Sequence, residues 1–138
     1  MDAKKRILAT LVGFVVFFLL GWLFYGFLLM NFYAENSGTA TGTMREEADM
    51  VWWALIVGNV FQAYFLVYVF GKWANITTFG GGFSAGLTIG LILGFAFNLS
   101  MYGTMNISNL TVSLVDPFVS GIMMAITGGV IGWMLGRK

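Results

Sequence analysis

The 138-residue chain contains no cysteine and no histidine, and only 9% of its residues are charged. Without these residue types the chain cannot build thiolate metal sites, redox pairs, haem ligation through histidine, or a serine–histidine catalytic pair. The net charge is +1, and the one basic cluster is "KKR" at residues 4–6. Because nucleic-acid binding needs a basic face, we expect no nucleic-acid partner. We also predict no metal, no cofactor and no catalytic residues, because no nucleophile–base–orienter set is visible.

What the chain has in abundance is apolar surface, since 59% of its residues are hydrophobic. A soluble chain this short could not hide that much apolar surface, so we predict that its solvent is the lipid bilayer. A membrane-spanning helix needs about 20 apolar residues. Four runs are long enough, at about residues 7–30, 50–70, 83–102 and 117–135. These runs predict an all-α integral membrane protein, with residues 1–138 forming one four-helix domain.

The basic residues fall on one side of the membrane if the chain crosses it four times. Positive residues tend to stay on the cytoplasmic side. The opposite side holds Arg45 alone, among several acidic residues. The charge pattern therefore predicts an antiparallel up-down bundle with both termini in the cytoplasm. The residues on the cytoplasmic side are Lys4, Lys5, Arg6, Lys72, Arg137 and Lys138.

Glycine recurs every fourth residue along the third span. Small residues at this spacing let two membrane helices approach closely. The fourth span carries a similar small-residue face, so we expect the two faces to pack together or against another copy of the chain. A strip that faces a ligand, a lipid chain or a pore remains the alternative. The predicted packing residues are Gly82, Gly86, Gly90, Gly94, Gly121, Ala125, Gly128 and Gly132.

Two short patterns predict helix starts. Thr43 and Glu46 have the spacing of a capping box, so the second helix is expected to begin near Met44. Asp116 followed by Pro117 also reads as a helix start, because aspartate is a favoured N-cap and proline suits the first helical position. The alternative is that Asp116 lies inside the membrane, where a carboxylate is expensive and indicates function.

Three amide side chains lie within the predicted spans, at Asn59, Gln62 and Asn98. An amide in hydrocarbon must find partners, so we expect Asn59 and Gln62, in the middle of the second span, to face the bundle interior. Asn98 lies in the outer part of the third span. They form either interhelical hydrogen bonds or, with Asp116, a small polar cavity. No lysine, arginine, glutamate or histidine lies deep in a predicted span, which argues against a proton-coupled pump or ion carrier.

The order of these features resembles a known family. Gly21, Trp22 and Tyr25 lie late in the first span, the third span reads "GGFSAGLTIGLILGF", and the chain ends with "GIMMAITGGVIGWMLGRK". This order is similar to a family of small four-span bacterial membrane proteins of unknown function. The resemblance implies a protein of the bacterial inner membrane and supplies no catalytic residues.

Two functional hypotheses follow. The first is a non-enzymatic protein that acts through helix–helix contacts, as an accessory subunit of a larger membrane complex or as a homo-oligomer. This hypothesis rests on the pair of small-residue faces and on the absence of a recognisable set of catalytic residues in the sequence. The second is an oligomeric small transporter or channel with a polar path lined by Asn59, Gln62 and Asn98. A lipid- or quinone-binding subunit is a third possibility, resting only on the abundance of aromatic residues and methionine.

Overall fold

The computed structural model describes residues 3–43 and 45–137. All regular elements in these ranges are helical, and one isolated β-bridge joins Ser37 to Ser108. In chain order the elements are α1 (Ala3–Leu23), the π-helical η1 (Phe24–Leu28), α2 (Met30–Glu35), the 3₁₀ turn η2 (Glu47–Asp49), α3 (Trp52–Tyr68), the π-helical η3 (Val69–Ala74), α4 (Phe79–Thr104) and α5 (Leu110–Leu135).

Four helices are long and apolar enough to cross a membrane, which confirms the predicted membrane character of the chain. They span Ala3–Leu28, Trp52–Ala74, Phe79–Thr104 and Leu110–Leu135. Each run of about 20 apolar residues has become one helix, because in lipid every backbone polar group must be satisfied within the segment.

The helix starts differ from the sequence predictions. Asn109, not Asp116, caps α5, because its side-chain oxygen accepts a hydrogen bond from the Val112 backbone at 2.9 Å. The fourth span therefore begins seven residues earlier than predicted, and Pro117 is buried inside the helix. The predicted start near Met44 falls on a residue outside the described ranges, and α3 itself begins at Trp52.

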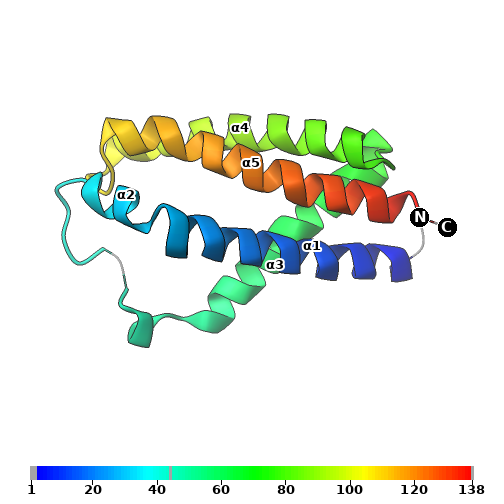
Figure 1. The fold of residues 1–138 in the computed structure, drawn as a ribbon, viewed down its shortest axis with the longest axis horizontal. Coiled ribbons are helices and arrows are strands. Elements are labelled where there is room, and N and C mark those ends of the chain that lie inside the picture. The colour runs from blue at the N-terminus through cyan, green and yellow to red at the C-terminus, as the bar shows by residue number, and fades with distance from the viewer. Residues whose placement is uncertain (1–2, 44, 138) are drawn as a thin grey trace.

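The central helix is α5, which lies between α1 and α4 (Figure 1). In the most apolar 18-residue stretch of α5, 61% of residues are buried. The corresponding share is 17–22% in the other three spans. The second span, which contains α3, crosses obliquely and packs mainly against α1. The start of α1 and the end of α5 lie at the same end of the molecule (Figure 1). We call this the terminal end, and the other the loop end.

Four glycines of α4, namely Gly82, Gly86, Gly90 and Gly94, lie directly against the backbone of α5 within the same chain. A methyl group added at Gly90 would lie 2.8 Å from the Gly121 Cα atom, and one at Gly94 would lie 2.8 Å from the Pro117 Cα atom. As residue numbers rise along α4 they fall along α5, so this pair runs antiparallel. The small residues of α5, namely Gly121, Ala125, Gly128 and Gly132, are all buried on this contact.

Packing is tightest toward the terminal end. The hydrophobic core comprises Ala9, Leu66, Val67, Phe70, Met124, Ile131 and Leu135. By contrast, residues 52–58 at the start of α3 are all exposed. Because α3 joins the core only through its second half, the bundle opens toward the loop end, where the polar residues of the spans lie.

Candidate functional site

Asp116 lies six residues inside α5 and is half-buried. At 1.5 Å per residue it is about 9 Å from the start of this helix. The 26-residue helix is about 39 Å long and exceeds a hydrocarbon core of about 30 Å. If α5 is centred in the membrane, Asp116 lies roughly 5 Å inside the core. Asp116 therefore does not cap α5, and it lies inside a helix that is long and apolar enough to cross a membrane.

Three neutral side chains donate hydrogen bonds to this carboxylate. The Tyr25 hydroxyl donates to Oδ1 at 2.9 Å, and the Tyr33 hydroxyl donates to the same oxygen. The Asn98 amide donates to Oδ2 at 2.8 Å. These donors come from η1, α2 and α4, so the carboxylate of α5 connects four separate elements.

The local structure explains why these groups meet. Gly94 lets α4 approach Pro117 closely, and Asn98 lies one helical turn further along α4 at the level of Asp116. Tyr25 belongs to a π-helical segment, a feature that occurs frequently at functional sites. The ring centroids of Tyr25 and Tyr33 are 5.1 Å apart, so the two hydroxyls reach one oxygen from neighbouring rings.

Backbone pairing between the two loops at this end holds α2 in place. The Gly38 amide donates to the Ile107 carbonyl, and the Asn109 amide donates to the Asn36 carbonyl. The Asn109 side chain also donates to Asn36 Oδ1 at 3.0 Å. Asn109 therefore caps α5 and fastens α2 at the same time. These contacts keep Tyr33 over the first turns of α5.

The Asp116 carboxylate faces a cavity of about 330 Å³. Three of the four residues predicted to form a polar cavity line it together: Gln62, Asn98 and Asp116. Ser120 adds a hydroxyl to the lining. The Gln62 amide donates to the Met124 sulfur at 3.2 Å, which is an interhelical bond between α3 and α5.

Asn59 is the predicted cavity residue that the structure places elsewhere. It is half-buried, and its amide donates to the Leu55 carbonyl of its own helix at 2.7 Å. The expectation that Asn59 faces the bundle interior assumed that α3 packs along its whole length. Because α3 diverges from the bundle near this point, Asn59 does not line the cavity that contains Gln62.

A second cavity, of about 530 Å³, lies at the loop end and is also lined by Tyr25 and Tyr33. Its other walls come from the two loops and from the start of α5. The tyrosine pair thus borders the loop-end cavity while it binds the carboxylate of the inner one. Sequence reasoning missed both tyrosines as site residues. The only available signal was a hydroxyl-bearing ring late in a phenylalanine-rich run.

The negative charge of Asp116 has no positive partner among the described residues of the site. All three partners of Asp116 are neutral, and the described lining of its cavity contains no lysine or arginine. Tyr33 lies in α2, outside the spanning segments, and burial together with the Asp116 carboxylate raises the pKa of its hydroxyl. Tyr33 therefore remains a proton donor at neutral pH. In the described ranges no group of three or more carboxylates is placed to hold a metal ion.

Comparison of the chain with protein-family models, curated proteins and solved structures finds no match. The resemblance to a family of small bacterial four-span proteins therefore stays a prediction.

Proposed function

We propose that the protein crosses the membrane four times as an antiparallel bundle, with both termini in the cytoplasm. The start of α1 and the end of α5 lie at one end of the molecule (Figure 1), and the basic residues concentrate at that end, which supports this orientation. The bacterial inner membrane is the location that the family resemblance implies, and we keep it as part of this proposal.

Within this topology, we propose that the protein is a non-enzymatic small transporter or channel that binds a cation at Asp116. The supporting observation is a carboxylate inside a helix of membrane-spanning length, with three neutral donors and no described basic residue, open to a cavity of about 330 Å³. Ionisable groups inside a membrane are rare and mark ion or substrate pathways. Four spans are few for a monomeric carrier, so the working unit is proposed to be an oligomer.

The chemistry of the site selects a cation. A charged aspartate at the centre of a membrane helix costs about 3 kcal/mol, and hydrogen bonds to a charged group contribute about 1.5–3 kcal/mol each. The three bonds offset the cost of burial and leave the negative charge uncompensated. A proton, an alkali cation or a small protonated amine would supply the missing charge. The faces of Tyr25 and Tyr33 add cation–π attraction for an organic ammonium group.

The test is a flux assay on the full chain reconstituted in liposomes, with protons, Na⁺, K⁺ and small alkylamines as probes. We expect transport or conductance for one of these cations and its loss in Asp116→Asn, which removes the charge with little change in shape. Asn59→Leu is the matched control, because Asn59 does not line the cavity. Absence of both flux and binding for all of these cations, or equal activity of wild type and Asp116→Asn, would overturn the proposal.

A second candidate function is an accessory subunit of a larger membrane complex. The observation that favours it is the start of α3, where residues 52–58 are exposed on every side of the helix. The glycine face of α4 does not support it, because α5 of the same chain already covers that face. Native mass spectrometry on protein extracted gently from its own membrane separates the two. A complex with an unrelated protein favours the accessory role, and a defined homo-oligomer favours the transporter.

A further inference from the structure

The cavity that holds the Asp116 carboxylate has mostly apolar walls. Besides the four polar residues already described, its described lining consists of two glycines and the apolar side chains of Phe17, Leu93, Phe97, Met101 and Met124. Its volume of about 330 Å³ is in the range of sites that bind small organic molecules, which combine apolar walls with a few polar groups. The cavity therefore has room for the apolar part of a ligand beside its one charged group.

The Asp116 carboxylate has few acceptor positions left for a ligand. A carboxylate offers about four lone-pair positions, and three hydrogen bonds already occupy them, from Tyr25, Tyr33 and Asn98. A metal cation gives up its hydration shell only where several oxygens replace it. A primary ammonium group brings three donors that each need an acceptor. The carboxylate therefore offers charge with little remaining hydrogen-bonding capacity, which suits a tertiary or quaternary ammonium ion.

The cavity opens on the outer face of the bundle. Phe97 is 65% exposed, and Met101, one turn further along α4, is 38% exposed. Phe97 lies seven residues before the end of the 26-residue α4. If this helix is centred in the membrane, Phe97 lies roughly 6 Å inside the hydrocarbon core. The opening then faces the acyl chains, so a ligand with an apolar part can reach Asp116 from the bilayer.

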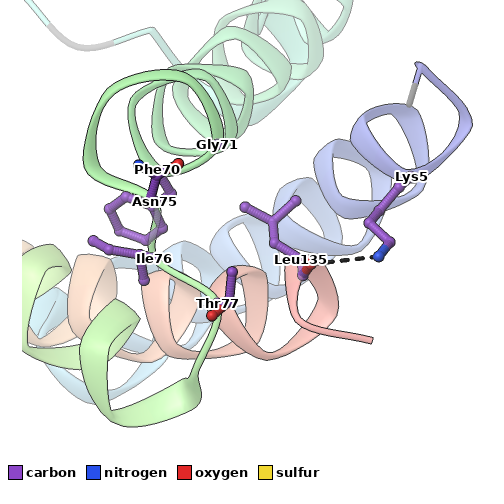
Figure 2. Close-up of a pocket in the computed structure, with 7 residues that line it drawn as sticks. All are labelled: Lys5, Phe70, Gly71, Asn75, Ile76, Thr77 and Leu135. Atoms are coloured by element: carbon purple, nitrogen blue, oxygen red, sulfur yellow. Dashed lines mark hydrogen bonds between the residues drawn. The ribbon is translucent and has the colours of Figure 1, made fainter. Parts of the chain in front are cut away.

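The terminal end is a poor entrance for a cation. The hydrophobic core is packed there. Lys5 extends from α1 toward the end of α5, and its ammonium donates to the Leu135 carbonyl at 3.4 Å (Figure 2). The positive charge of Lys5 repels cations at this end of the molecule. In this conformation the exposed side of the cavity is therefore the more favourable way in.

We propose that the cation bound at Asp116 is a tertiary or quaternary ammonium ion with an apolar substituent, which enters from the bilayer and packs against Phe97. This inference rests on the proposed function, because it names the class of cation for the same site. The aromatic rings of the cavity attract such an ion through cation–π interactions. Its apolar substituent gains the free energy of leaving water, which a metal ion or a proton cannot gain.

The experiment measures equilibrium binding of radiolabelled butyltrimethylammonium to the full chain in detergent micelles. The competitors are tetramethylammonium, Na⁺ and K⁺. The two ammonium ions carry the same charge and differ only in the length of one alkyl substituent. We expect butyltrimethylammonium to bind at least about tenfold more tightly than tetramethylammonium. Na⁺ or K⁺ in large excess should not displace it, and binding should be lost in Asp116→Asn.

A substitution in the apolar wall tests where the substituent lies. Phe97→Ala should weaken butyltrimethylammonium binding by about threefold or more and leave tetramethylammonium binding within about twofold of wild type. Phe61→Ala is the matched control, because Phe61 is similarly exposed, at 68%, and does not line the cavity. It should change neither affinity. The comparison of the two ligands on the wild-type chain needs no variant, so it remains decisive if a variant fails to fold.

The outcomes separate this inference from the proposed function. Equal affinities for the two ammonium ions, equal effects of Phe97→Ala and Phe61→Ala, or displacement by Na⁺ or K⁺ at comparable concentration would overturn the ammonium inference. Flux of protons, Na⁺ or K⁺ that depends on Asp116 would then still support the proposed function. Ammonium binding that is unchanged in Asp116→Asn would overturn the inference, and absence of binding and flux for every cation would overturn both.

Discussion

Replacing single glycines of α4 by alanine tests the central contact of the fold. A methyl group at Gly86 would collide with the carbonyl oxygen of Met124 and lie 2.8 Å from its carbonyl carbon and 3.2 Å from the Ala125 Cα atom. Ordinary van der Waals contacts are 3.4–4 Å, so α4 and α5 would have to separate by roughly 1 Å. The obstacle is backbone on both helices, which cannot move aside as a side chain can.

The change in the free energy of unfolding follows from two opposing effects. Alanine in place of glycine stabilises a helix interior by about 0.5–1 kcal/mol, and overpacking a close contact costs about 1–3 kcal/mol. Gly58 in α3 has nothing within 4 Å of an added methyl group, so Gly58→Ala should show the gain alone. Both variants share the helix gain, so we expect the free energy of unfolding of Gly86→Ala to fall about 1–3 kcal/mol below that of Gly58→Ala.

The assay is reversible unfolding in mixed micelles with increasing dodecyl sulfate, followed by circular dichroism. Gly103→Ala is a second control, because its added methyl group would also meet open space. If Gly86→Ala were as stable as Gly58→Ala, α4 and α5 would not be in backbone contact, and the antiparallel pairing would be wrong. A destabilisation that appears only with a change of oligomeric state would move the contact from within the chain to between chains.

Three other substitutions test the site and its supports. Asp116→Leu removes the acceptor of the Tyr25 and Tyr33 hydroxyls and of one Asn98 amide hydrogen bond, while Asn98 keeps its bond to the Gly94 carbonyl. The free energy of unfolding should therefore fall by about 1–3 kcal/mol. An unchanged value in the same dodecyl sulfate titration would contradict the hydrogen-bonded cluster. Asn109→Ala removes the cap of α5 and should lower the free energy of unfolding by about 1 kcal/mol. The backbone amides of α2 should also exchange their hydrogens faster with solvent. Unchanged exchange of these amides would show that other contacts hold α2. Tyr33→Phe tests the raised pKa of the Tyr33 hydroxyl. Because the folded protein favours the neutral hydroxyl, the contribution of this group to the free energy of unfolding is complete below pH 10.0 and is lost as the pH rises above that value. The stability difference between wild type and Tyr33→Phe should therefore be constant at neutral pH and shrink in alkali, and a difference that grows in alkali would refute the assignment.

The membrane helices were predictable because their signal is physical and local. An apolar run of sufficient length must become a helix in lipid, whatever its neighbours are. The start of α5 was not predicted correctly, because the pair Asp116–Pro117 was interpreted as the helix start and Asn109 was not considered. In the structure the cap is Asn109, and Pro117 is buried in the helix interior, which membrane helices tolerate.

The site was predictable only in part. Gln62, Asn98 and Asp116 stand out because polar groups in an apolar span need partners, and the structure brings these three to one cavity. Asn59 satisfies the same rule differently, through a hydrogen bond to its own backbone. Tyr25 and Tyr33 lie 91 and 83 residues from Asp116 in the chain. No local pattern encodes such a distance, so their role depends on how the elements pack.

The α4–α5 pair is closely packed, whereas the start of α3 has few contacts. This difference in packing indicates which elements would move in a transporter. At Gly82, Gly86, Gly90 and Gly94 the backbone of α4 lies directly against the backbone of α5, so a shift of one helix requires a shift of the other. Asp116 and Asn98 are carried by this pair and keep their spacing. Gln62 belongs to α3, whose first seven residues contact no other element closely enough to be buried. Access to the carboxylate should therefore change through α3 and the tyrosines of η1 and α2, while the glycine-packed pair stays fixed.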